Sequence, residues 1–138
     1  MSYVVDASVA MKWLVPEPLS DQAARLLDHP ASLSAPDLLL VEAANVLWRK
    51  TARREITGGE ADRALAILDG SGIDLYPVRP LIARALELAR TLEHPVYDCV
   101  YLALAGRERI PLVTADTRFI AAISRHRLRI DVVDLAKL

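Results

Sequence analysis

The sequence lacks the features that mark exported, membrane-spanning or zinc-binding proteins. Its 138 residues include one cysteine, Cys99, so no disulfide can form within the chain. That usage fits a reducing compartment, and we expect the protein to act in the cytoplasm. No apolar run approaches the ~20 residues of a membrane-spanning helix, and the first residues lack the basic segment and cleavage site of a secretion signal. We therefore expect no membrane association.

Histidine is also scarce, with His29, His94 and His126 as its three occurrences. They show no ligand spacing and stand in polar or loop-like surroundings, so we interpret them as ordinary surface residues. Hydrophobic residues make up 53% of the chain. Because no membrane segment accounts for this excess, we expect apolar surface that meets a protein partner.

What the sequence does contain is an alternation of short apolar strands with amphipathic helices. Strands are predicted at residues 3–5, 31–35, 73–78, 110–114 and 130–133. Helices are predicted at residues 9–14, 19–27, 36–54, 60–68, 80–93, 98–104 and 116–124. Strands that are separated by helices pair in parallel through right-handed crossovers. The sequence thus predicts an α/β fold, a three-layer α/β/α sandwich with a central parallel sheet, as a single domain spanning residues 1–138.

Four acidic residues stand in unusual settings. Asp6 follows the first strand, Asp116 follows the fourth, Asp98 precedes an apolar helix, and Glu42 lies inside an apolar helix. Ligands of parallel sheets collect at the carboxyl ends of the strands. Each aspartate has the alternative role of a helix N-cap, since Asp is a favoured capping residue.

Glu42 needs a different explanation, because its helix is apolar nearly all round and is expected to be buried on most faces. An unpaired carboxylate there costs several kcal/mol or takes up a proton. Asn45 and Arg49 lie on the same helical stripe. A hydrogen-bonded network of Glu42 with these two residues is therefore the structural alternative to a functional site.

Considered together, the four acids favour a metal site. Converging carboxylates repel one another and raise their own pKa values, so such a cluster is tolerable near neutral pH only with a cation between them. Hard oxygen ligands favour Mg²⁺ or Mn²⁺ over zinc.

The motifs around these acids follow one another in a recognisable order. They are Val5, Asp6, Ala7 and Ser8; Glu42, Ala43, Ala44, Asn45 and Val46; Tyr97, Asp98, Tyr101, Ala103 and Ala105; and Thr114, Ala115, Asp116 and Phe119. The ordered set resembles the PIN-domain ribonucleases, and within them the VapC-type toxins of toxin–antitoxin pairs. The resemblance implies a central parallel sheet and metal-dependent cleavage of RNA by a water molecule, which leaves a 5′-phosphate and a 3′-hydroxyl.

The resemblance also implies roles for individual residues. The metal-site and catalytic acids would be Asp6, Glu42, Asp98 and Asp116, and the supporting polar residues would be Ser8, Asn45 and Thr114. Some relatives have a further acid where this chain has Phe119, so a second metal ion would be held less well. The basic residues Arg49, Lys50, Arg53 and Arg54 are candidates for contacts with the RNA backbone. A homodimer and a cognate antitoxin are the implied protein partners.

Two other functions compete with this interpretation. One is a phosphatase with Asp6 as covalent nucleophile, although the chain has Ser8 where that chemistry usually needs a second acid. The other is a catalytically silent PIN-like module that acts through protein contacts. Trp13 and Trp48 would fit a binding groove, but we expect them to fill the core.

Overall fold

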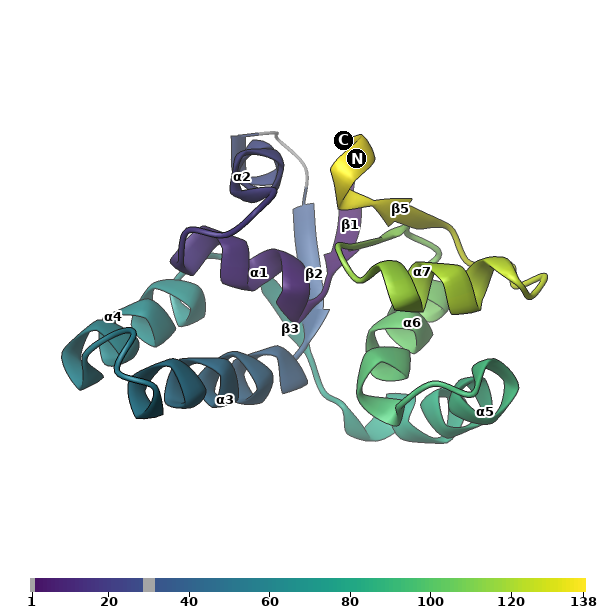
Figure 1. The fold of residues 1–138 in the computed structure, drawn as a ribbon. Coiled ribbons are helices and arrows are strands. Elements are labelled where there is room, and N and C mark those ends of the chain that lie inside the picture. The colour runs from purple at the N-terminus through teal and green to yellow at the C-terminus, as the bar shows by residue number, and fades with distance from the viewer. Residues whose placement is uncertain (1, 29–31) are drawn as a thin grey trace.

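The computed structural model describes residues 2–28 and 32–138, and in it a five-stranded parallel sheet is surrounded by helices (Figure 1). The strands are β1 (Ser2–Val5), β2 (Ser32–Pro36), β3 (Asp74–Tyr76), β4 (Leu112–Thr114) and β5 (Val132–Asp134). The helices are α1 (Ala7–Leu14), α2 (Ser20–Asp28), α3 (Leu38–Ala52), α4 (Gly58–Asp69), α5 (Ile82–Leu92), α6 (Val96–Glu108) and α7 (Thr117–Ser124). Single 3₁₀ turns lie at Arg79–Leu81 and Leu135–Lys137. The predicted start of the second strand, Ala31, and one histidine, His29, lie outside the described residues.

The order of the strands is β3-β2-β1-β4-β5, which places the first strand at the centre of the sheet. Val4 of β1 is in register with Ser34 of β2 on one side and Leu112 of β4 on the other. From β1 the chain first builds the sheet in one direction through β2 and β3. It then returns to the other side of β1 with β4 and β5. The reversal makes a switch point between β1 and β4, where ligands of open parallel sheets bind.

Consecutive residues of β1 face opposite layers of helices, as the period of two in a strand requires. Val4 and Val5 are both fully buried. Val4 belongs to a core cluster with residues of α3, α5 and α6, and Val5 belongs to a second cluster with residues of α1 and α2. The predicted three-layer α/β/α sandwich with a parallel sheet is therefore confirmed.

The start of α4 shows how capping chemistry moved a predicted boundary. Thr57 Oγ1 accepts a hydrogen bond from the Glu60 backbone N–H at 3.1 Å, and Glu60 Oε1 accepts one from the Thr57 N–H at the same distance. This capping box starts the helix at Gly58. Gly58 and Gly59, which precede the predicted start of this helix at residue 60, therefore lie in its first turn.

The expectation that α3 is buried on most faces is wrong. Val41 and Trp48 are exposed over 65% and 64% of their surface. Trp48 consequently does not fill the core. Trp13 does pack against it, and its Nε1–H donates to the carbonyl oxygen of Ala23 at 2.7 Å, which links α1 to α2. Within residues 2–28 and 32–138, no helix combines the length and apolarity required to cross a membrane.

The buried face of α6 belongs to the larger core cluster, which gives a test by truncation. Leu102 is fully buried in the larger cluster, whereas Leu86 on α5 is 47% exposed. Leu102→Ala leaves a cavity and should lower the free energy of unfolding by about 2–5 kcal/mol. Leu86→Ala, the matched control, should lower it by less than about 1 kcal/mol. Urea unfolding of both variants measures the difference, and equal losses would contradict the assigned core.

Candidate functional site

Asp6 is the most buried of the four acids. It lies at the carboxyl end of β1 and caps α1, with Oδ1 accepting hydrogen bonds from the Val9 N–H at 3.2 Å and the Ser8 hydroxyl at 2.6 Å. The Thr114 hydroxyl donates to Oδ2 at 2.5 Å. Burial raises the pKa of Asp6 to about 6; these three bonds act in the opposite direction, and the charge of Asp98 adds to the increase. Burial therefore makes the ionised form of Asp6 energetically costly unless a cation lies nearby.

Ser8 and Thr114 join the two strands of the switch point. Beyond its bond to Asp6, Ser8 Oγ accepts from the Ala115 N–H at 3.0 Å, and Thr114 Oγ1 accepts from the Asp116 N–H at 3.1 Å. Each hydroxyl therefore donates to the acid after β1 and accepts from the backbone after β4. This arrangement fixes the position of Asp6 relative to the turn that carries Asp116.

Asp116 is also a helix cap. Its Oδ1 accepts hydrogen bonds from the backbone N–H groups of Arg118 at 3.0 Å and Phe119 at 3.2 Å, at the start of α7. The capping role that the sequence allowed is thus correct for Asp6 and Asp116. Capping occupies one oxygen of Asp116 and leaves the other available.

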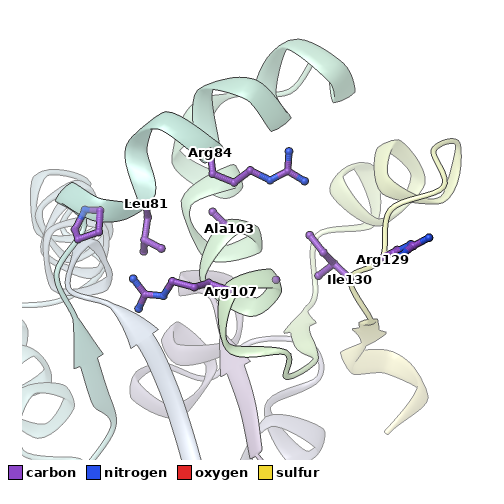
Figure 2. A pocket seen from close by; sticks show the side chains of 8 residues that line it. Leu81, Arg84, Ala103, Arg107, Arg129 and Ile130 are labelled. Atoms are coloured by element: carbon purple, nitrogen blue, oxygen red, sulfur yellow. The ribbon is translucent and has the colours of Figure 1, made fainter.

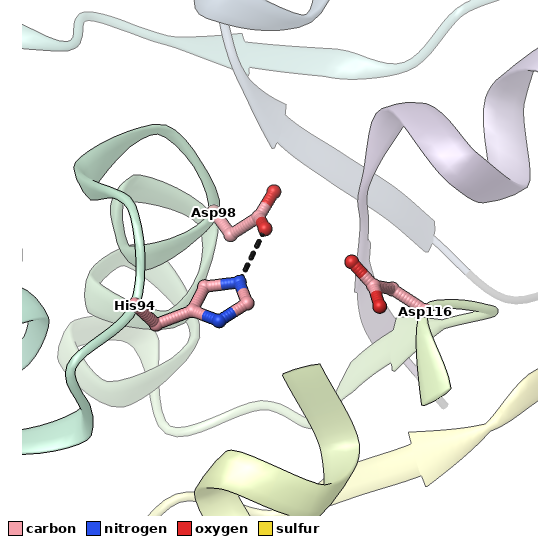
Figure 3. A group of neighbouring side chains, drawn as sticks. All are labelled: His94, Asp98 and Asp116. Atoms are coloured by element: carbon pink, nitrogen blue, oxygen red, sulfur yellow. Dashed lines mark hydrogen bonds and ion pairs between the residues drawn. The ribbon is translucent and has the colours of Figure 1, made fainter. Parts of the chain in front are cut away.

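For Asp98 the capping interpretation is wrong. Helix α6 begins at Val96 with Pro95 as its N-cap, so Asp98 lies inside the first turn. Its Oδ2 is 2.6 Å from Nε2 of His94, as Figure 3 shows. A carboxylate oxygen can only accept, so the imidazole is the donor when Asp98 is ionised.

The interpretation of His94 as an ordinary surface residue is also wrong. Its side chain is only 14% exposed, and its ring stacks on Phe119 with a centroid separation of 4.6 Å. Ligand atoms of His94, Asp98 and Asp116 all lie within 4.8 Å of one another, and in the described part of the chain this is the group that can hold a metal ion. The four-residue spacing between His94 and Asp98 was the available signal. His126, by contrast, is exposed.

Glu42 is held by a residue that the sequence had not connected with it. The hydroxyl of the fully buried Tyr101, on α6, donates to Glu42 Oε1 at 2.5 Å. Asn45 and Arg49 are exposed, and in residues 2–28 and 32–138 neither forms a hydrogen bond with Glu42. Burial raises the pKa of Glu42, the bond from Tyr101 opposes this, and the charge of Asp98 adds to it.

Asp98 is the electrostatic centre of the site. Its charge contributes to the raised pKa of Asp6, of Glu42 and of Cys99, whose pKa reaches about 11 mainly through burial. Burial and the charge of Glu42 raise the pKa of Tyr101 as well, so its hydroxyl stays a neutral donor. Ligand atoms of Asp98 and Asp116 thus lie within 4.8 Å of each other, and the charge of Asp98 acts on both Asp6 and Glu42.

The donor chemistry of this group fits a hard divalent cation. Protein donors hold one side of each acid, and each acid keeps an oxygen lone pair for another partner. Within the described residues, no hydrogen bond reaches Oδ1 of Asp98, Oδ2 of Asp116 or Oε2 of Glu42, and Oδ2 of Asp6 accepts only one. The residues present therefore offer oxygen ligands without a competing lysine or arginine.

Two groups of basic residues lie apart from the acids. Arg49, Lys50, Arg53 and Arg54 occupy the carboxyl end of α3, and all except Lys50 are exposed. A second group surrounds a cavity of about 380 Å³ near the end of α6 (Figure 2). Two of its arginines are neutralised, since Arg84 pairs with Glu87 at 2.9 Å and Arg107 with Glu108 at 3.0 Å. This cavity therefore contributes nothing to the acid group at the other end of the helix.

Comparison with known proteins is consistent across sequence and structure. The sequence profile of the PIN domain matches residues 3–124. Ribonuclease VapC3 of Pyrobaculum aerophilum is 33% identical over 118 residues, which cover 84% of this chain and 90% of the relative. Ribonuclease VapC9 of Mycobacterium tuberculosis is 36% identical over 115 residues, which cover 83% of this chain and 86% of the relative.

Solved structures agree on the fold. The crystal structure of a Pyrobaculum aerophilum protein superposes with a TM-score of 0.72 at 22% identity, covering 99% of this chain and 94% of the other. That of Mycobacterium tuberculosis VapC20, a toxin that cleaves the sarcin-ricin loop, superposes with a TM-score of 0.70 at 23% identity, covering 88% and 95%. At these identities the likeness shows the fold alone.

The raised pKa of Asp6 predicts a dependence of stability on pH. An acid whose pKa is higher in the folded than in the unfolded state destabilises the fold as it ionises, so the parent loses stability between pH 3.8 and about 6. Asp6→Asn keeps the cap and removes the charge. With chelator, this variant should be more stable than the parent at pH 7.5, by up to about 3 kcal/mol. The difference should vanish near pH 4; a variant that is less stable at both pH values would contradict the burial cost.

The hydrogen bond between Tyr101 and Glu42 makes a second prediction. Tyr101→Phe leaves a half-buried carboxylate oxygen without its donor and should lower the free energy of unfolding by about 1–3 kcal/mol at pH 7.5. In a Glu42→Gln background the same change should cost less, because no charge is left unpaired. Denaturant unfolding of the four proteins gives the coupling, and independent effects would show that the bond contributes nothing.

Proposed function

Since this chain belongs to the PIN-domain family, and within it to the VapC ribonucleases, we propose that it is an endoribonuclease that hydrolyses RNA phosphodiester bonds. It would act as the toxin component of a toxin–antitoxin pair. The observation that carries the proposal is the gathering of acids around Asp98: ligand atoms of Asp98 and Asp116 lie within 4.8 Å of each other, and the charge of Asp98 acts on both Asp6 and Glu42.

The metal-site and catalytic acids of this proposal are Asp6, Glu42, Asp98 and Asp116, which would hold Mg²⁺ or Mn²⁺. Such an ion, when bound, neutralises phosphate charge and lowers the pKa of a water molecule. The protein's part is to keep the acids in place: Thr114 and Ser8 hold Asp6, backbone N–H groups hold Asp116, and Tyr101 holds Glu42. Asn45, exposed one turn beyond Glu42 on α3, would support the site from the solvent side.

The RNA would extend from the acids along α3. Arg49 and Lys50 lie in the last turn of this helix, which also carries Glu42, and Arg53 and Arg54 follow directly after its end. Their guanidinium and ammonium groups suit the phosphate backbone. Lys50 already pairs with Glu55 at 3.4 Å, so the three exposed arginines are the stronger candidates.

The proposal includes protein partners, namely a cognate antitoxin and a second copy of the chain. Exposed apolar side chains support such contacts, since Val41, Trp48 and Ile67 on α3 and α4 are each exposed over 64–65% of their surface. A structurally similar protein from Klebsiella pneumoniae is part of a toxin–antitoxin complex, with a TM-score of 0.64 at 19% identity. We place the protein in the cytoplasm, as a single nuclease domain spanning residues 1–138.

The environment of Asp6 argues against the competing phosphatase. That chemistry usually needs a second acid two residues after the nucleophile, and here this position is Ser8, whose hydroxyl donates to Asp6 Oδ1 at 2.6 Å. The other alternative, a catalytically silent interaction module, is distinguished from a nuclease by an assay of RNA cleavage.

The test is RNA cleavage by the purified chain, free of any partner, with Mg²⁺ or Mn²⁺ and with chelator. Asp116→Asn keeps the helix cap and removes one ligand charge, so cleavage should fall by about 100-fold or more. Asp74→Asn is the matched control, because Asp74 is an exposed residue at the start of the edge strand β3 and its replacement should be neutral. Absence of metal-dependent cleavage by the folded parent would favour the silent module.

A further inference from the structure

His94 lies between two helices, yet its position is defined by four contacts. Its backbone N–H donates to the carbonyl oxygen of Ala89 at 3.2 Å, and the Cys99 thiol is 4.0 Å from its carbonyl oxygen. Its side chain contacts Asp98 through Nε2 and stacks on Phe119 at an interplanar angle of 21°. The His94 side chain is 14% exposed and contacts two other side chains, so these contacts restrict its rotation.

Phe119 connects the imidazole to the other side of the acid group. The phenyl ring is fully buried, and the Phe119 backbone N–H donates to Asp116 Oδ1 at 3.2 Å. A continuous series of contacts therefore leads from Asp98 through His94 and Phe119 to Asp116. Asp98 comes from α6 and Asp116 from the turn before α7, so the stacked rings join two elements whose carboxylate oxygens lie within 4.8 Å of each other.

Two carboxylates at this separation repel each other, and a free Asp98 side chain would rotate away from Asp116. The contact with His94 Nε2 occupies Oδ2 of Asp98 (Figure 3), and in the described residues Oδ1 accepts no hydrogen bond. A second partner that orients a metal ligand in this way typically changes metal affinity by 10–100-fold, roughly as measured for other outer-shell hydrogen bonds.

We infer that His94, stacked against Phe119, is a positioning residue that holds Asp98 opposite Asp116 for a divalent cation. The inference rests on the proposed function, since it assigns a role within the same site. Although a ring nitrogen of His94 lies within ligand distance of both aspartates, its Nε2 is taken up by Asp98 Oδ2, so we assign His94 to act through Asp98 and not as a ligand.

The test compares Mn²⁺ affinity among variants, from the rise in melting temperature with metal concentration. His94→Phe keeps an aromatic ring against Phe119 but removes the donor, and should weaken Mn²⁺ binding by about 10-fold or more. His94→Gln restores an N–H donor at a similar reach and should stay within about 3-fold of the parent. His126→Phe, at an exposed histidine, is the control and should bind as the parent does.

Several outcomes would overturn the inference. If His94→Phe binds Mn²⁺ as tightly as the parent, His94 positions nothing. If His94→Gln is as weak as His94→Phe, the imidazole itself is a metal ligand and the positioning role is wrong. The melting temperatures without metal show whether each variant is folded, and so separate weaker binding from misfolding. A further variant, Phe119→Leu, removes the stacking partner of His94 and keeps the donor. An unchanged Mn²⁺ affinity in that variant would also contradict the role of the stacked pair.

The proposed function and this inference fail in different ways. If the parent binds Mn²⁺ but cleaves no RNA, the proposed nuclease function is wrong. The effect of His94→Phe on Mn²⁺ affinity can still be measured in that case. A parent that cleaves RNA, beside a His94→Phe variant with parental Mn²⁺ affinity, overturns only the role of His94.

Discussion

The burial of acidic side chains near one another, at one edge of the sheet, is the constraint on which the site depends. Burial raises the pKa of both Asp6 and Glu42, and the charge of Asp98 adds to the increase. The protein opposes this with hydroxyls, backbone N–H groups and one imidazole, and in the described residues no lysine or arginine pairs with the four acids. Neutral donors fix the carboxylates without cancelling their charge, so the electrostatic demand for a cation persists.

The fold was predictable where short-range patterns decide it. Apolar runs located all five strands, and the alternation with helices was sufficient for the layers. The order of the strands was not predictable, because it depends on which edge of β1 accepts β4. The predicted start of α6 was two residues late, because Asp is a more favoured N-cap residue than Pro. The actual N-cap, Pro95, depends on where the chain leaves α5. Glu93 ends α5 in the left-handed region, with φ of 51°.

The acids were predictable and their partners were not. Asp6, Glu42, Asp98 and Asp116 attract notice because each is out of place in its local sequence. Their partners come from distant segments: Thr114 is 108 residues from Asp6, and Tyr101 is 59 residues from Glu42. His94 is close in sequence to Asp98, but its burial depends on Phe119 of α7, which no local pattern indicates. Sequence context thus identifies strained residues, whereas only the packed fold identifies what relieves the strain.

The double use of Asp6 and Asp116 as helix caps has a genetic consequence. Asparagine caps a helix as well as aspartate does, and a single guanine-to-adenine change in the first codon position converts one into the other. Each of these positions is therefore one base away from a chain that keeps its caps and loses a site charge. Under the proposed function, a single base change at either position would therefore remove activity while the fold and the exposed surface of α3 and α4 remain.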